Sequence, residues 1–159
     1  MREIKFRAKR IDNGAWAYGS GVLIADDYSV IDVDSEMYED EKYEWCGATH
    51  FYRVAGAKCD TSTLGQFTGL KDENEKEIYE GDVVDWTFFY ACGGLQGAVE
   101  KDITLRGVIR WGTAGFIFEV WENDFENAGW YGISSLNFDS TSDIEVIGNI
   151  YDNPELVEQ

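Results

Sequence analysis

The sequence has little proline and few basic residues, and each scarcity argues against a class of protein. Its 159 residues include one Pro and one His, with 13 Lys and Arg against 31 Asp and Glu. A chain so poor in proline is not a proline-rich disordered segment. The formal net charge of −18 argues against attraction to nucleic-acid phosphates or anionic membranes, since both depend on Lys and Arg. We therefore expect no direct nucleic-acid partner and no membrane partner.

Long hydrophobic runs are also missing. No apolar stretch approaches the length that spans a bilayer. Residues 1–7 alternate charged and apolar side chains, where a signal peptide would have an apolar stretch. The three Cys cannot all pair within one chain. Without a secretory signal they are expected to be reduced thiols in a cytoplasmic protein.

Aromatic residues and glycine are abundant instead. Phe, Trp and Tyr make up 15% of the chain, and there are 17 Gly. Aromatic side chains favour strands, and glycine supplies turns with positive φ. The predicted fold is therefore mainly β and rich in hairpins. The length suits one domain, or two small lobes that share a core, and it suffices to fold without a metal or a disulfide.

Alternating side chains predict a half-buried strand over residues 2–9. Ile4, Phe6 and Ala8 fall on its inner face, and Arg7 falls on its charged outer face. The turn signal at residues 12–14 and a second strand region over residues 16–24 complete a hairpin.

Further strands are predicted downstream of this hairpin. They cover residues 63–70, 77–79, 83–90, 105–111, 116–121 and 144–150, with 83–90 apolar on both faces and hence central. Residues 80–82 form a predicted tight turn, 92–97 a connection and 122–132 a loop. Asn153 and Pro154 are the expected N-cap and first residue of a short C-terminal helix.

Three segments resemble the YopX family of phage-encoded proteins. They are residues 1–7 (MREIKFR), 65–84 (GQFTGLKDENEKEIYEGDVV) and 145–156 (EVIGNIYDNPEL). Their order and spacing run across the whole chain. In the family, Gly usually follows the Asn of the central turn, whereas Glu75 follows Asn74 here. The turn is therefore longer, or Asn74 alone takes the left-handed conformation.

The resemblance implies a phage or prophage origin, and hence the cytoplasm of a bacterial host. It also implies a single domain over residues 1–159, with an N-terminal β lobe over 1–63 and an SH3-like β-barrel part over 64–159. It implies no established activity and no catalytic residues, and fold analogy supplies none.

Candidate sites for catalysis or metal binding are weak. Cys46, His50, Cys59 and Cys92 are the conceivable zinc ligands, but no paired Cys-x-x-Cys spacing is present. Residues 32–36 look faintly like a calcium loop but lack its Gly and its final Glu. Cys46 and His50 would share one face of a helix, but this region is predicted to be strand or loop. We therefore assign no catalytic, cofactor-binding or metal-binding residue, and we expect no cofactor.

Two candidate contact surfaces remain. One is an acidic stretch whose carboxylates could form a negative patch. It comprises Asp26, Asp27, Asp32, Asp34, Glu36, Glu39, Asp40, Glu41 and Glu44. The other is an aromatic group, Trp121, Trp130 and Tyr131, since exposed aromatics with polar surroundings mark protein interfaces.

Three functions fit these observations. The first is an accessory protein that acts by protein–protein contact or self-assembly, through exposed aromatics or a strand edge. The second is an acidic mimic of nucleic acid that occupies a basic protein of the host or phage. The third, an uncharacterised hydrolase or metal enzyme, has no specific residue in its support.

Overall fold

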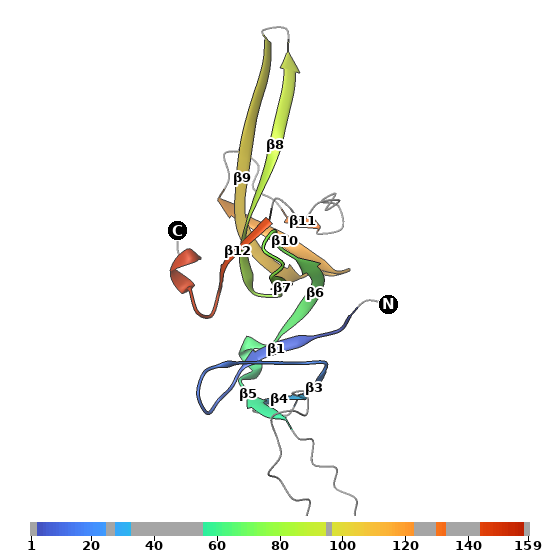
Figure 1. Cartoon of the computed structure of the whole chain (residues 1–159), viewed down its shortest axis with the longest axis vertical. Helices are drawn as coiled ribbons and strands as arrows, with labels where there is room; N and C mark the ends of the chain where they lie inside the picture. The colour runs from blue at the N-terminus through green and yellow to red at the C-terminus, as the bar shows by residue number, and fades with distance from the viewer. Residues whose placement is uncertain are drawn as a thin grey trace, which may run out of the picture. The chain divides into compact units, whose positions relative to one another are not determined.

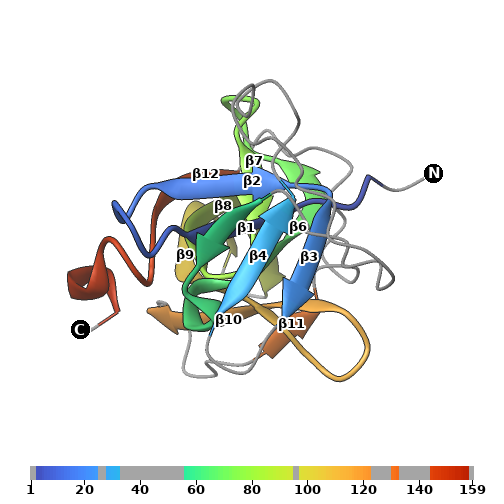
Figure 2. The same ribbon diagram turned by 90° about the horizontal axis from the view of Figure 1, so that it is seen from below.

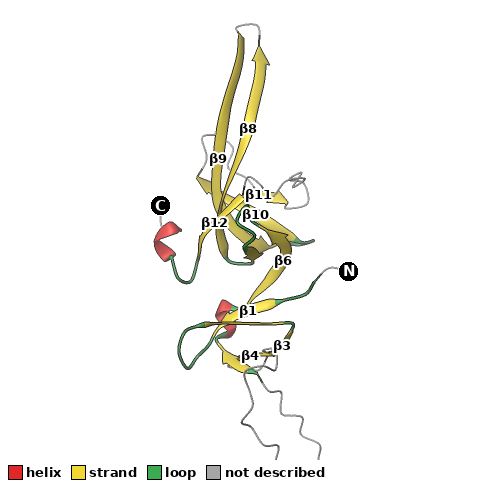
Figure 3. Ribbon diagram, viewed as in Figure 1, coloured by secondary structure: helices red, strands yellow, loops and turns green. Residues whose placement is uncertain are grey.

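Strands make up most of the residues that this computed structural model describes (Figure 3), which are 3–24, 28–32, 56–94, 97–122, 130–132 and 144–157. Helical structure in these residues is confined to two 3-10 turns, Thr61–Thr63 (η2) and Pro154–Leu156 (η4). The prediction of a mainly β, hairpin-rich fold is confirmed. The chain divides into two compact units, Met1–Gln66 and Phe67–Gln159 (Figure 1). No helix among the described residues has the length and apolar character needed to cross a membrane.

In its described residues the first unit contains five short strands: β1 (Phe6–Lys9), β2 (Trp16–Gly19), β3 (Gly21–Ile24), β4 (Ser29–Asp32) and β5 (Ala57–Cys59). The predicted hairpin is present, because β1 and β2 pair antiparallel around a turn in which Gly14 takes φ 71°. Its predicted second strand, residues 16–24, is two strands, because residues 21–24 form β3 and pair with β4. Strands β3, β4 and β5 form a three-stranded sheet, and Figure 2 shows β3 and β4 side by side. A small core joins the strands of this unit: Ala8, Ala17, Ile31, Ala57 and Cys59.

The alternation of β1 was predicted only in part. Ala8 is fully buried as expected, but Ile4 is 54% exposed and Arg7 is only 5% exposed. The guanidinium of Arg7 lies 4.6 Å from the ring centroid of Trp16. A cation over an aromatic ring is stabilised by the ring quadrupole, and the apolar stem of arginine tolerates burial. The expected outer face of this strand is therefore partly an inner face.

Strand β6 (Gly65–Lys71) crosses the boundary between the units. Gly65 and Gln66 pair with β1, whereas Phe67 and Lys71 pair with β7 (Glu77–Tyr79). The turn between β6 and β7 contains Glu75, which has φ 62° and is the one non-glycine residue of the described chain with a positive φ. Glu75 itself therefore takes the left-handed conformation that the sequence suggested for Asn74.

The second unit is built on a five-stranded antiparallel sheet. Its order is β11 (Trp130–Gly132), β10 (Phe116–Glu122), β9 (Gly97–Trp111), β8 (Asp82–Gly94) and β12 (Ile144–Asn149). The predicted central position of residues 83–90 is confirmed only in part, because β8 lies between β9 and β12 as far as Trp86 and pairs with β9 alone beyond it in the described residues. In the described residues β11 and β12 are the two edges of this sheet, and the SH3-like barrel stays a prediction. The core of the unit comprises Ile78, Val84, Ile103, Leu105, Ile109, Phe116, Phe118, Val120, Ile144 and Val146.

Two predicted connections in this unit are strand in part. Residues 92–97 were predicted to be a connection, but β8 continues to Gly94 and β9 begins at Gly97, with these two residues paired. Residues 122–132 were predicted to be a loop, but Trp130–Gly132 pairs with β10. In both places the pairing of neighbouring strands outweighs the local turn preference of Gly.

The C-terminal 3-10 turn begins as predicted, with Asn153 before Pro154, but Asn153 makes no capping hydrogen bond to it. Its side-chain Oδ1 instead accepts a hydrogen bond of 3.4 Å from the backbone N–H of Asn149. The side chain thus ties the turn to the end of β12.

Candidate functional site

The acidic stretch falls almost wholly outside the described residues. Asp32 is exposed at the end of β4, opposite Gly21 of β3. The other eight predicted residues lie outside the described residues: Asp26, Asp27, Asp34, Glu36, Glu39, Asp40, Glu41 and Glu44. The acidic patch therefore stays a prediction.

The three predicted interface aromatics lie on two neighbouring strands at one edge of the five-stranded sheet. Tyr131 is paired with Phe118, and Trp130 is paired with Glu119. Trp121 lies where the register of β10 shifts, between Val120 and Glu122. The backbone thus brings the three positions together, while their side chains lie outside the description.

Cys59 is the one candidate zinc ligand whose side chain the structure describes. It is fully buried in the core of the first unit, and its Sγ donates to the carbonyl oxygen of Ala57 at 3.3 Å. Burial raises the pKa of the Cys59 thiol, so the nucleophilic thiolate is disfavoured. Among the described residues, His, Cys, Asp and Glu form no group of three that could hold a metal ion. Cys46, His50 and the side chain of Cys92 lie outside this description.

Asp72 is a buried carboxylate and therefore a candidate catalytic residue. It is 2% exposed, and its Oδ1 accepts hydrogen bonds from the backbone N–H groups of Asn74 at 2.8 Å and Lys76 at 2.9 Å. Its Oδ2 accepts from the N–H of Val146 at 3.1 Å. A carboxylate held by three backbone donors organises a turn and joins it to β12.

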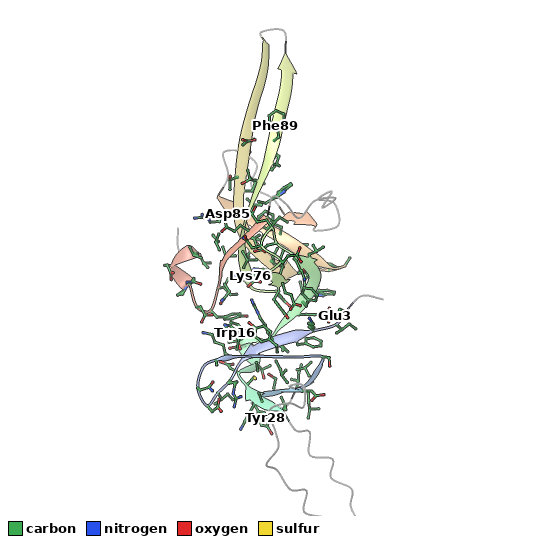
Figure 4. All side chains as sticks on the ribbon, viewed as in Figure 1. Glu3, Trp16, Tyr28, Lys76, Asp85 and Phe89 are labelled. Atoms are coloured by element: carbon green, nitrogen blue, oxygen red, sulfur yellow. The ribbon has the colours of Figure 1, made fainter. Side chains whose placement is uncertain are left out.

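Two further contacts join the same segments. The N–H of Glu73 donates to the carbonyl oxygen of Ile144 at 3.0 Å, and Lys76 Nζ donates to the carbonyl oxygen of Val146 at 3.3 Å. Figure 4 labels Lys76 in this region. We call residues 72–76 and 144–146 the clasp. Their contacts show that the central segment and the closing segment of the chain meet in space.

Gly81 makes a second junction between these segments. It has φ 85°, and a Cβ added there would lie 3.1 Å from Tyr151 Cε2. Its carbonyl oxygen accepts from the N–H of Ile150 at 3.0 Å. Asp82, which is 1% exposed, accepts from the N–H of Tyr79 at 2.8 Å. Asp72, Gly81 and Asp82, which all belong to the segment 65–84, therefore make contacts that stabilise the fold.

The outer part of the β8–β9 hairpin has a different character. In the described residues, pairing of β12 with β8 ends at Trp86, and pairing of β10 with β9 ends at Arg106. Beyond them β8 and β9 pair only with each other, from Thr87–Thr104 to Gly94–Gly97. We call residues 87–94 and 97–104 the arm. Figure 1 shows it extending from the other strands of its unit.

The base of the arm is firmly anchored. Arg106 and Asp85 form a bidentate ion pair, with both N–O distances 2.8 Å. Trp86 and Phe88 stack with their ring centroids 4.6 Å apart and pack against the core. Further along the arm, Phe89 is 63% exposed. Figure 4 places Asp85 at the base and Phe89 farther out.

Sequence reasoning missed the arm as a structural element, although a signal was present. From Trp86 to Val99 the chain has no Asp, Glu, Lys or Arg, whereas 28% of the whole chain is charged. An isolated two-stranded ribbon is marginally stable in water. A ribbon with open edges and a long uncharged stretch is instead suited to a contact with another chain.

Comparison with known proteins supports a family assignment. A family model described as YopX protein matches residues 5–158. No curated protein matches the chain. One similar solved structure is the crystal structure of protein EF1440 from Enterococcus faecalis, with 23% sequence identity, coverage of 98% of each chain and a TM-score of 0.48.

Proposed function

This chain belongs to the YopX family, and from that premise we propose that it acts by protein–protein contact, with the arm as its contact region. The observation that carries the proposal is the ribbon of residues 87–104, in which β8 and β9 pair only with each other among the described residues. An edge strand with unpaired backbone groups binds another strand by extending the sheet.

The surface chemistry of the arm supports the same conclusion. Phe89 exposes 63% of its surface, and an exposed large aromatic is a common anchor of protein interfaces. The Thr87 and Thr104 hydroxyls face each other at 2.8 Å on an exposed part of the ribbon. The arm thus combines an apolar anchor with polar groups, as a contact surface does.

Two buried carboxylates of the second unit also bear on the proposal. The buried carboxylates Asp72 and Asp82 accept hydrogen bonds from backbone N–H groups. They are therefore committed to the fold and are not available as catalytic groups. Following the family, we propose an accessory role for a phage or prophage protein in the cytoplasm of its bacterial host.

A shortened arm tests this proposal. Phe88 and Ile103 are directly paired, so a two-residue Asn-Gly turn can join them in place of residues 89–102. The variant keeps Ile103, which is 1% exposed in the core. We expect it to unfold within about 1 kcal/mol of the full chain, because it removes a ribbon that is marginal by itself.

The full and shortened chains are then compared by affinity capture from host lysate at high salt. We expect a protein, or further copies of this chain, to bind the full chain and to be lost from the shortened one. Equal binding to both would contradict the proposal. A control variant with Asp102→Asn keeps the arm and should bind like the full chain.

A nucleic-acid mimic is the second candidate, and the net charge of −18 favours it. Its proposed site is the acidic stretch between Asp26 and Glu44. A basic partner would bind at low salt and dissociate at high salt. Amide substitutions at Asp32, Asp34, Glu39 and Asp40 should weaken this binding, and unchanged binding would dismiss the stretch.

A further inference from the structure

We propose that the outer edge of β8, over residues 87–93, pairs antiparallel with the same edge of a second copy of this chain. This inference rests on the proposed function of the arm and names its partner. It follows from which backbone groups face outward, from the absence of charge along this edge and from the symmetry of self-pairing.

The clasp reveals which backbone groups of β8 face outward. The N–H of Val146 donates to Asp72, and the carbonyl oxygen of Ile144 accepts from Glu73. These groups of β12 therefore point away from β8. In an antiparallel pair, hydrogen-bonded and non-hydrogen-bonded positions alternate. Hence the backbone N–H and C=O of Glu145, which lies opposite Asp85, point towards β8 and bond to it.

The same alternation continues along the arm. Asp85 directs its N–H and C=O towards β12, so every second residue beyond it directs these groups to the same side. These residues are Thr87, Phe89, Ala91 and Gly93. The hydroxyls of Thr87 and Thr104 approach to 2.8 Å, as side chains do in the closer, non-hydrogen-bonded pairs of a ladder. In the described residues no strand covers this edge.

Nothing along this edge blocks the approach of another strand. Natural sheets protect their edges with charged residues, proline or bulges. Residues 86–94 contain no charged residue and no proline, and the β8–β9 register is unbroken there. The opposite edge of the arm differs, since β9 carries Glu100, Lys101 and Asp102. Pairing is thus directed to one of the two edges.

A second copy fits this edge better than a charged partner does. With a net charge of −18, two copies repel each other wherever their carboxylates approach. The edge of β8 is a long uncharged segment at which this repulsion is least. A basic partner, drawn by the acidic surface, would find no carboxylate on residues 86–94 to bind.

Two-fold symmetry satisfies both edges at once. With the symmetry axis at Tyr90, Thr87 lies opposite Gly93 of the second copy, and Phe89 lies opposite its Ala91. All four are outward-facing positions. Because the β8 edge of each copy is then paired with the β8 edge of the other, the pairing closes as a dimer and does not continue into a fibre.

Sedimentation equilibrium of the full chain over a range of concentrations tests the proposal. We expect a monomer–dimer equilibrium. Ala91→Pro removes one outward N–H from each copy without removing a bond to β9, and the dimer dissociation constant should rise at least about thirtyfold. Glu100→Pro is the matched control, because Glu100 is paired with Ala91 but faces the other edge. It should leave the dimer intact.

A second variant covers the case in which Ala91→Pro disturbs the fold. Phe89→Lys places a charge on the β8 edge and should also dissociate the dimer. Asp102→Asn, at the position opposite Phe89, makes the same change in net charge and should not. A chain that stays monomeric at all concentrations, or a dimer that resists both β8 variants, overturns the inference. If a different protein is still captured through the arm, the proposed function survives this failure.

Discussion

The carboxylate of Asp72 accepts a hydrogen bond from the backbone N–H of Val146 at 3.1 Å, across a separation of 74 residues. The same carboxylate holds the turn between β6 and β7 through Asn74 and Lys76. One side chain therefore stabilises the β6–β7 turn and joins it to β12, an edge strand of the five-stranded sheet.

Removing this carboxylate should destabilise the protein strongly. Asp72→Ala leaves three backbone N–H groups without their acceptor, so we expect unfolding to become easier by about 3 kcal/mol in urea titrations. Glu73→Ala is the control, because the Glu73 side chain is exposed and its backbone bond to Ile144 remains. Its effect should stay within about 0.5 kcal/mol. Equal effects would show that the hydrogen bonds of the Asp72 carboxylate do not stabilise the fold.

Replacing Glu75 by glycine should stabilise the fold. Its φ of 62° is unfavourable for a residue with a Cβ, and glycine removes that strain. Glu75→Gly should raise the free energy of unfolding by about 1 kcal/mol. Glu75→Ala also loses the exposed ion pair with Lys71, at 3.2 Å, but keeps the strain, and it should not stabilise. If the two variants are equally stable, the left-handed turn is not strained.

Gly81 should tolerate a side chain less well than Gly14 does. Both have positive φ, but a Cβ at Gly81 meets Tyr151 at 3.1 Å, whereas a Cβ at Gly14 meets nothing within 4 Å. Gly14→Ala should cost about 1 kcal/mol from the backbone alone. Gly81→Ala should cost about 2 kcal/mol in thermal unfolding, because Tyr151 must also move. A smaller effect at Gly81 would contradict the close packing.

Asp60 offers a test by titration. The Ser62 hydroxyl donates to its carboxylate at 2.7 Å, and this bond, followed by the Ser62 N–H, lowers the pKa of Asp60 below the ordinary value of 3.8. The ionised form therefore stabilises the fold above pH 4 and loses that effect as the pH falls through the lowered pKa. Ser62→Ala should raise the pKa of Asp60, measured by carboxyl NMR. Ser20→Ala should not change it.

The sequence predicted the features that depend on local pattern. The turns at Gly14 and Gly81 follow from glycine placement, and the strand over residues 116–121 follows from its apolar pattern. The clasp could not be predicted in this way, since a bond between Asp72 and Val146 depends on tertiary structure. Nothing local distinguishes Asp72 from other turn aspartates.

The arm and Arg7 show why local preference misleads. Gly93 and Gly94 have turn preferences that suggested a connection, yet the register carries them as paired strand residues. Arg7 alternates with apolar residues and was predicted to lie on the exposed face, yet it is buried with its guanidinium over the ring of Trp16. In both cases the partner strand, which lies outside the local window, decides the outcome.

Amide hydrogen exchange along β8 tests the central claim most directly, because neighbouring residues of the arm should behave differently. In dilute solution the amides of Phe88 and Tyr90, which face β9, should exchange slowly, and those of Thr87, Phe89 and Ala91 should exchange fast. On concentration, the outward amides should become protected as the edge is covered. Outward amides that are as protected as the inward ones in the dilute chain would contradict the account, because the edge would then be covered already.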